Sequence, residues 1–446
     1  MSNVLCKPVP QSVAIFGASG HIGGPMARYL QFHAPQVRLR LIGSNADKVE
    51  ILQENFPGVE VVQANYFDQA SLDAAMVGMA GVMVLTTTGL REEPAMTNLV
   101  AAVRKAGCLS HMIRVVGVQP DSNPRRIPQA LRDYGLGLEI QHPIARQILD
   151  GAGLPVTYLN VGASYMDNFL RMVPSIQNDL LPWPDRLVPY VDPREVGEAA
   201  ARLMLSDDAR HIGQFYTLNN GDTPLRTSEV AKLMTEVFLR RIHHDGSREA
   251  LDEYFKPLVE AGLLPPQVPE YLWNFFQYEE VNAPVWVPNQ FLERVLGRKP
   301  TTMRAWLQEH RQRFDKDDAP LQVSTERTSV TAQVEPSAGT NAMIDGQWEC
   351  AVSTPVGKEP YLLQVCANPD GTLHGQMTHQ RNGSVMPLLN GRFNGNQLAW
   401  SMQLLKPIKA TLKVEVSVDG DTLQGHARTG LFGKVALRGR KLSASA

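Results

Sequence analysis

Length, composition and charge limit what this chain can be. Its 446 residues, of which 43% are hydrophobic and 20% charged, predict a globular protein of two or three domains. The formal net charge of −2 argues against nucleic acid or an anionic membrane as the main partner. No apolar run is long enough to span a bilayer, and residues 1–11 lack the apolar core of a signal peptide. Four scattered cysteines without a CxxC pair predict no disulfide framework, no metal site and a cytoplasmic location.

A glycine-rich turn near the N-terminus organises the first half of the chain. The apolar run Val13–Phe16 predicts a buried strand, and a helical pattern begins at Pro25. Between them, Gly17, Gly20 and Gly23 have the spacing of a turn that lets backbone approach a pyrophosphate at a helix N-terminus. We therefore predict a dinucleotide site here. The expected cofactor contacts of the turn are Gly17, Ser19, Gly20, His21, Ile22 and Gly23.

The second predicted strand, Val37–Gly43, ends where the adenosine ribose of a dinucleotide should lie. An Asp or Glu at this tip would bind the 2′-hydroxyl of NAD, but the chain has Ser44 and Asn45 instead. These side chains could donate to a 2′-phosphate, and Lys48 or Arg40 could add positive charge. The pattern favours NADP, with NAD as the alternative cofactor. A second interpretation is that Asn45 only caps the following helix.

Strands and helices continue to alternate as far as residue 161. The predicted elements are a strand over Val59–Ala64, a helix from Ser71, a strand over Gly81–Leu85, a helix over Pro94–Ala106, a strand over Met112–Val116, a helix over Leu138–Gly151 and a strand over Pro155–Val161. Such units predict an α/β fold with a Rossmann-type doubly wound parallel sheet. Thr86 and Thr87 follow one of these strands, so they could touch the cofactor or only satisfy loop backbone. Pro120–Gly137 predicts a long loop near the cleft.

Short motifs spread over roughly residues 12–315 follow the order found in one known family. They are Gly17–Gly23, Asn65–Asp68 with Ser71-Leu72, Gly151–Leu159, Gly162–Phe169, Val295–Thr302 and Trp306–Arg311. Together they resemble the NmrA-like atypical short-chain dehydrogenase/reductases, a group that includes isoflavone and pinoresinol–lariciresinol reductases. The resemblance implies an NAD(P)H cofactor and a cleft between the sheet and a substrate subdomain at about residues 160–315. Some members of this group reduce aromatic or polyketide-like molecules, and others only sense the dinucleotide.

The proton donor of such a reductase is not obvious in this chain. Ordinary short-chain dehydrogenases use a Tyr-x-x-x-Lys pair, which the predicted helix Leu138–Gly151 lacks. In the isoflavone-reductase-like branch, a catalytic Lys stands four residues before an Arg, and here His142 stands four residues before Arg146. An imidazole could serve as general acid or base. Alternatively, His142 next to Pro143 has no chemical role.

Three other residues could line the cleft. Tyr165, a second catalytic candidate, and Asn168, a substrate contact, lie on the loop expected to cover the nicotinamide. Tyr134 in the preceding loop is a further substrate contact, whereas Tyr165 could equally pack against the sheet. Aromatic residues concentrate over Tyr254–Trp286, which predicts a subdomain core and an apolar wall for an aromatic substrate. The pair His243-His244 has no further ligand at metal spacing and is expected at the surface.

The C-terminal quarter has a different pattern. Residues 316–342 are polar without apolar periodicity and predict a flexible linker after a first domain over residues 1–315. Over residues 343–446, short strand patterns alternate with turn signals such as Asn394-Gly395, which predicts a small antiparallel barrel or sandwich. This domain could bind a ligand, form a homo-oligomer or contact the first domain.

Taken together, these patterns favour an NADP(H)-dependent reductase of a carbonyl or an activated double bond in an apolar metabolite, aromatic ones included. A competing hypothesis is a non-catalytic NAD(P)-sensing regulator, since the usual Tyr-Lys pair is missing. A third is an enzyme that keeps a bound nucleotide for isomerisation or cleavage. The main expected partner is a small-molecule substrate, whereas the regulator would use the C-terminal domain to bind its partner.

Overall fold

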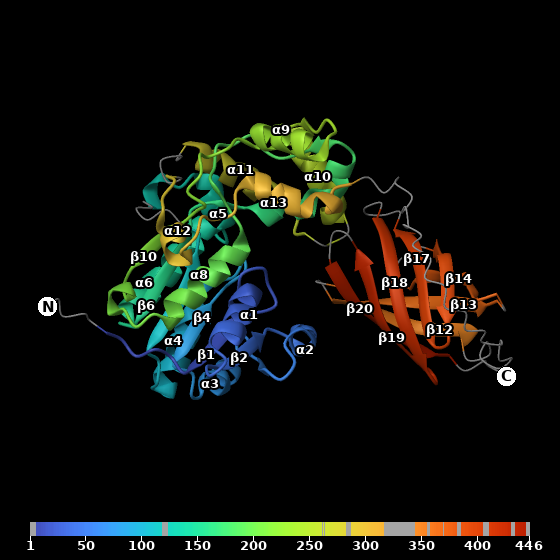
Figure 1. The fold of residues 1–446 in the computed structure, drawn as a ribbon, viewed down its shortest axis with the longest axis horizontal. Helices are drawn as coiled ribbons and strands as arrows, with labels where there is room; N and C mark the ends of the chain where they lie inside the picture. The colour runs from blue at the N-terminus through green and yellow to red at the C-terminus, as the bar shows by residue number, and fades with distance from the viewer. Residues whose placement is uncertain are drawn as a thin grey trace. The chain divides into compact units, whose positions relative to one another are not determined.

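The structure is a computed structural model in which the chain forms two compact units (Figure 1). The first comprises Met1–Phe169, Trp183–Arg248 and Gln267–Arg311, and the second Leu170–Pro182, Glu249–Pro266 and Gln312–Ala446. The structure describes residues 6–117, 124–260, 262, 264–281, 287–315, 344–354, 357–368, 370–380, 385–404, 410–429 and 433–442. The linker predicted over residues 316–342 lies outside this described part.

A seven-stranded parallel sheet forms the centre of the first unit, in the order β10-β6-β5-β4-β1-β2-β3. Its strands are β1 (Ser12–Phe16), β2 (Arg38–Gly43), β3 (Glu60–Gln63), β4 (Gly81–Val84), β5 (His111–Val116), β6 (Val156–Val161) and β10 (Phe215–Leu218). This confirms the Rossmann-type α/β fold. The order reverses between β1 and β4, and ligands of open α/β sheets bind at the carboxyl ends of the strands at such a point.

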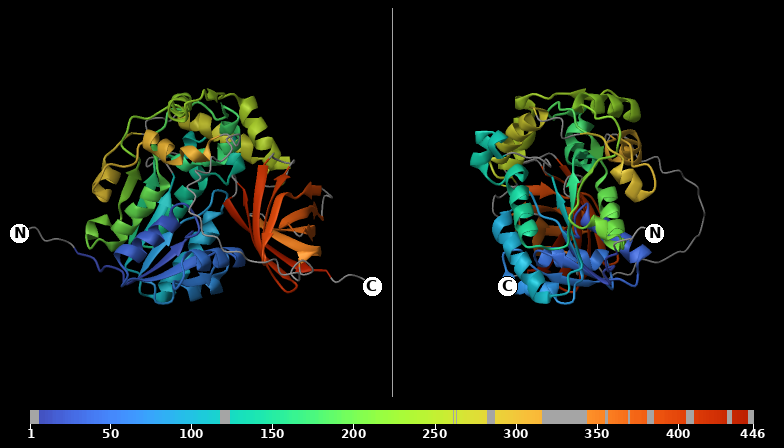
Figure 2. Two further views of the ribbon diagram at one scale, coloured as in Figure 1. Left: turned by 45° about the vertical axis from the view of Figure 1, so that its right-hand side comes forward. Right: turned by 90° about the vertical axis from the view of Figure 1, so that its left-hand side faces the viewer.

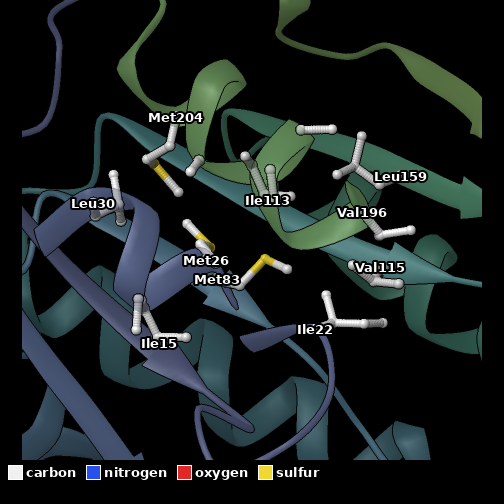
Figure 3. Packing of buried hydrophobic residues seen from close by; sticks show 14 of the residues in the cluster. Ile15, Ile22, Met26, Leu30, Met83, Ile113, Val115, Leu159, Val196 and Met204 are labelled. Carbon is white, nitrogen blue, oxygen red and sulfur yellow. The ribbon is translucent and has the colours of Figure 1, made fainter. Parts of the chain in front are cut away.

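Helices cover both faces of this sheet (Figure 2). They are α1 (Gly23–His33), α2 (Ala46–Asn55), α3 (Gln69–Met76), α4 (Glu92–Ala106), α6 (Leu138–Gly151) and α8 (Pro193–Leu205). On one face, side chains of α1 and α8 meet those of the central strands in a fully buried cluster (Figure 3). A Cβ on Gly197 of α8 would lie 2.4 Å from the carbonyl oxygen of Ile22, so this glycine lets α8 pack directly on the start of α1.

The segment predicted as a long loop, Pro120–Gly137, is helical in its described part, so the loop prediction is wrong there. It contains the 3-10 turn η1 (Pro124–Arg126) and the helix α5 (Gln129–Tyr134). The helix is only six residues long, but Leu131 is buried with Ile127 and Tyr271 from a distant helix. Because this contact is not local in sequence, the Pro- and Arg-rich composition gave no sign of it.

The remaining elements belong to the first unit and to the helical part of the second. They are β7 (Ser164–Tyr165), η2 (Met166–Met172), α7 (Val173–Gln177), β8 (Leu180–Leu181), β9 (Tyr190–Val191), η3 (Ala209–His211), α9 (Thr227–Phe238), β11 (His243–His244), α10 (Arg248–Glu260), α11 (Val268–Val281), α12 (Phe291–Leu296), α13 (Met303–His310) and η5 (Arg311–Arg313). The aromatic-rich stretch supplies buried Phe255, Tyr271, Phe276 and Tyr278. In the described residues, no helix is both long and apolar enough to cross a membrane.

The second unit contains a closed antiparallel barrel. Its strands are β12 (Gly346–Thr354), β13 (Gly357–Ala367), β14 (Thr372–His379), β15 (Val385–Pro387), β16 (Leu389–Asn394), β17 (Gln397–Leu404), β18 (Ala410–Asp419), β19 (Thr422–Thr429) and β20 (Gly433–Lys441). They follow the order β13-β12-β20-β19-β18-β17-β16-β14-β15, and a further β13–β14 pairing closes the sheet. Apolar side chains fill the interior, including the fully buried Trp348, Leu363, Met377 and Leu437. The predicted barrel is thereby confirmed.

Candidate functional site

The glycine turn between β1 and α1 has the geometry of a phosphate-binding turn. Gly17 has φ +68°, which favours glycine, and its carbonyl accepts a hydrogen bond from the Gly20 amide at 2.9 Å. A Cβ on Gly23 would lie 2.5 Å from the Gly17 carbonyl oxygen, so the helix can start this close to the strand only with glycine there. Ser19 and His21 are exposed. The Ile22 side chain is buried in the core, so only the backbone of Ile22 belongs to the surface of the turn. The turn thus offers exposed backbone at a helix N-terminus.

The tip of β2 carries no carboxylate. Ser44, Asn45 and Lys48 are all exposed there. Asn45 is also the N-cap of α2, since its Oδ1 accepts a hydrogen bond from the Lys48 amide at 2.9 Å, so the predicted cap is present, and its contact with a cofactor stays a prediction. Arg40 cannot add charge at the tip, because its guanidinium is buried, pairs with Glu60 at 2.8 Å and donates to backbone carbonyls at the C-terminal end of α3. That part of the prediction is wrong.

A buried ion pair that the sequence analysis did not find lies beyond the end of β4. Arg114 of β5 and Glu92 at the start of α4 are within 2.5 Å and at most 1% exposed. The Thr86 hydroxyl donates to Glu92 at 2.5 Å and accepts from Arg114 at 2.8 Å. The Thr86 hydroxyl is therefore hydrogen-bonded to buried side chains of the protein itself. Thr87, the next residue after Thr86 in the segment that follows β4, is exposed.

His142 lies on the buried face of α6, at the carboxyl end of β5. Its Nδ1 accepts a hydrogen bond from the Gly117 amide at 2.9 Å, and its Nε2 is 4.0 Å from Glu92 Oε1. Burial and, next, the charge of Arg114 lower the pKa of His142 well below its ordinary value. This shift favours the neutral ring over an imidazolium at this position.

The glycine turn also contacts the loop after β6. His21 Nδ1 is 2.7 Å from Asp167 Oδ2, and the His21 ring lies 4.8 Å from the ring of Tyr165. Burial and then the Asp167 charge raise the pKa of Tyr165, so its hydroxyl stays protonated. Asn168 follows on η2 and is half-buried. The structure thus brings Tyr165 to the predicted cofactor turn.

Tyr134 belongs to a different group of residues, around the start of α6. Its ring stacks on Tyr271 of α11 at a centroid distance of 4.3 Å. The Tyr271 hydroxyl donates to Glu139 Oε2 at 3.1 Å and accepts from the Leu138 amide at 3.3 Å. Burial raises the pKa of Glu139 to about 7. Sequence analysis overlooked Glu139, although it stands three residues before His142 and therefore on the same helical face.

The pair His243-His244 forms part of β11, and His244 Nε2 hydrogen-bonds the Trp183 carbonyl at 2.8 Å. Within the described ranges, no group of three or more His, Cys, Asp or Glu residues could hold a metal ion. The four cysteines are free thiols.

Comparison with known proteins shows the family of this chain. The sequence model of the NmrA-like family matches residues 10–246, which is more than half of the chain. The chain belongs to the NmrA-like family. The resemblance is thereby confirmed over residues 10–246, a region that contains the glycine turn but neither the motifs Val295–Thr302 and Trp306–Arg311 nor the barrel.

Three known proteins are similar to this chain. Quinone oxidoreductase 2 of Escherichia coli is 23% identical over 298 residues, which cover 65% of this chain and 96% of that protein. Its NADPH complex has a TM-score of 0.55 at 22% identity and covers 67% of this chain and 99% of that one. A (4-alkanoyl-5-oxo-2,5-dihydrofuran-3-yl)methyl phosphate reductase of Streptomyces griseus is 24% identical over 319 residues, 68% of this chain and 99% of the relative. The negative transcriptional regulator NmrA, solved with NADP, has a TM-score of 0.52 at 17% identity, covering 68% and 95% of the two chains.

Proposed function

We propose that this protein is an NADP(H)-dependent reductase of a carbonyl or an activated double bond in an apolar metabolite, aromatic ones included. The observation that carries the proposal is the turn between β1 and α1. A side chain at Gly23 would collide with the Gly17 carbonyl, and the exposed backbone of the turn faces outward at the switch point of the sheet. This is a cradle for a pyrophosphate, and it fits a dinucleotide.

The β2 tip supports NADP over NAD. Ser44 and Asn45 stand where a carboxylate would otherwise bind a free ribose hydroxyl, and Lys48 adds an exposed positive charge. Neither side chain would repel a 2′-phosphate. The E. coli relative is described as NADPH-dependent and the regulator was solved with NADP, which is consistent with this choice. When bound, the reduced cofactor supplies a hydride.

The residues of the chain itself would hold and enclose the substrate. Tyr134 and Tyr271 present stacked rings beside the N-terminus of α6, which suits a flat or apolar molecule. Tyr165 and Asn168 would cover the nicotinamide from the loop after β6. His142, neutral and bonded to the Gly117 amide, would fix the end of β5 and the start of α6 relative to each other. The E. coli and Streptomyces relatives are named as reductases or oxidoreductases of small molecules, which supports a redox reaction.

One observation favours the sensor as a second candidate function. The family position of a catalytic Lys carries His142, and burial keeps its pKa too low for it to act as a charged group. A regulator that only binds the dinucleotide would tolerate that change. The regulator NmrA shows that dinucleotide binding occurs in this fold in a protein named for transcriptional control.

Isotope transfer separates the two candidates. The protein is incubated with NADPH deuterated at the nicotinamide C4 and with a panel of quinones, enones and aromatic ketones, and the products are analysed by mass spectrometry. Deuterium in a product shows hydride transfer and supports the reductase. Saturable NADPH binding with no deuterated product across the panel supports the sensor. The control is Gly23→Val, in which the turn cannot form and no deuterium should be transferred.

A further inference from the structure

Glu139 is a buried acid near the N-terminus of α6, on the face of this helix that packs against the sheet. The buried residues of this helix are Glu139, His142, Ala145 and Leu149, which follow helical spacing along one stripe. Ala145 and Leu149 lie in the core between the sheet and the helices. His142 accepts a hydrogen bond from the amide of Gly117, the residue that follows β5. Glu139 is three residues further toward the helix N-terminus, about 4.5 Å along the axis. It therefore extends beyond the carboxyl edge of the sheet, on the side where a nicotinamide bound at this edge would lie.

Only one of the two carboxyl oxygens of Glu139 has a hydrogen-bond partner from another residue in the described part of the chain. The residue is 6% exposed, and its Oε2 accepts the hydrogen bond from Tyr271. Its Oε1 is buried and has no hydrogen-bond partner in the described part of the chain. A buried carboxylate oxygen without a partner is costly, whereas a protonated oxygen there can donate to a ligand. Because Oε2 accepts from Tyr271, a proton on this carboxyl group would be carried by Oε1.

The groups around Glu139 do not include a cation bonded to it. Tyr134 of α5 and Tyr278 of α11 feel its charge, as does the hydrogen-bonded Tyr271. The buried Glu279 of α11 adds a negative charge near Glu139 and forms an ion pair with Arg186. The Arg186 guanidinium also lies over the Phe276 ring and donates to the Ser164 hydroxyl at 3.4 Å. Arg186 is thus committed to Glu279. The helix N-terminus favours a carboxylate, but burial prevails and the pKa of Glu139 is raised to about 7.

We propose that Glu139 is the proton donor of the reduction, with Tyr271 as the positioning residue that orients its carboxyl group. The proposal rests on the reductase function above. The substrate carbon accepts a hydride from the reduced nicotinamide cofactor, which is oxidised, and the electron pair of the C=O or conjugated C=C bond moves to the substrate oxygen. That oxygen takes the proton from Glu139 Oε1, and the carboxylate left behind accepts the Tyr271 hydrogen bond at Oε2. Water restores the proton after product leaves.

The first test is Glu139→Gln in the full-length protein, with an acceptor found in the isotope assay. Turnover should fall about 100-fold or more, as expected when a general acid is lost, while the NADPH dissociation constant stays within twofold. The wild-type rate should decline above pH 7, and this decline should be absent from the variant. Glu93→Gln is the matched control, since it makes the same change at an exposed residue in the first turn of α4. Unchanged turnover in Glu139→Gln, or a decline that persists in it, overturns the proposal.

Tyr271→Phe keeps the proposal testable if Glu139→Gln does not fold. The Tyr271 hydrogen bond favours the charged form of Glu139, so its loss should move the decline in rate to higher pH. A decline that stays in place contradicts the pairing. Infrared spectra, recorded with no acceptor, should show one carboxyl group titrating near pH 7 and absent from Glu139→Gln. If that group titrates near pH 4.5, the proton donor is wrong whatever the enzyme reduces; if it titrates near 7 but no acceptor takes deuterium, the reductase function has failed instead.

Discussion

The parallel sheet of the first unit and the barrel of the second satisfy their polar backbone in different ways. The parallel sheet leaves the carboxyl ends of its strands open, and turns, helix N-termini and buried polar side chains gather there. The barrel pairs β13 with β14, removes its sheet edges and fills its interior with apolar side chains. Polar groups capable of binding and chemistry thus concentrate in the first unit. We infer that the dinucleotide site is built from residues of the first unit.

The largest effect should be a loss of stability when a cavity is created in the barrel core. Trp348 is fully buried, and its Nε1 donates to the Ile344 carbonyl at 3.1 Å. Trp348→Ala should lower the free energy of unfolding of the barrel by about 3–5 kcal/mol, measured by denaturant titration, and leave NADPH affinity unchanged. A parallel loss of NADPH affinity would show that the barrel does shape the site. Phe32→Ala, on an 80% exposed side chain, serves as control.

Gly23→Val should weaken dinucleotide binding at the open carboxyl edge of the parallel sheet. The added side chain meets the Gly17 carbonyl and forces the helix away from the strand. We expect the NADPH dissociation constant to rise at least about 100-fold, which is about 2.7 kcal/mol of binding free energy, as measured by calorimetry. Gly151→Ala is the control, because a Cβ there meets nothing within 4 Å. Binding unchanged by Gly23→Val would contradict the assignment of the turn.

Glu139 also makes a prediction about stability that does not depend on activity. Its pKa is about 7 in the folded protein against an ordinary 4.5, so the folded state holds this proton more tightly than the unfolded chain. Its contribution is most favourable below pH 4.5 and is lost as the pH rises to 7 and above, by about 3 kcal/mol. Between pH 5 and pH 8, urea titrations should show that the wild type loses about 2.5 kcal/mol more stability than Glu139→Gln. Equal losses would mean that Glu139 ionises normally.

The smallest expected effect is at the β2 tip. Ser44→Asp places a carboxylate beside the proposed 2′-phosphate position, so NADPH binding should weaken about tenfold and NADH binding should tighten. Gln53→Asp adds the same charge at an exposed position further along α2 and should change neither constant by more than twofold. If both variants behave alike, the tip does not choose the cofactor.

Local patterns predicted most of the fold. The period and composition of the apolar runs gave β1, β6 and the full extent of α6, because each of these elements buries apolar residues that its own sequence marks. The barrel followed from strand lengths and turn residues. What failed was the helix α5, whose buried Leu131 depends on Tyr271, a residue 140 positions later. Contacts of this kind leave no local signal.

The site was less predictable for the same reason. The glycine turn is a continuous motif, and its geometry agrees with its spacing. His142 was noticed from its position relative to Arg146, but its neutral state comes from burial and from Arg114 on another strand. Arg114 with Glu92, and Glu139 with Tyr271, each join residues from separate elements. Single-sequence patterns cannot pair such charges.

The central claim is that the open edge of the parallel sheet binds NADP(H). The direct measurement is a titration of the full-length chain with NADPH and, separately, NADH, followed by calorimetry. The account predicts one saturable NADPH site per chain, with NADPH bound at least about tenfold more tightly than NADH, a difference of about 1.4 kcal/mol. Failure to bind either dinucleotide would contradict it.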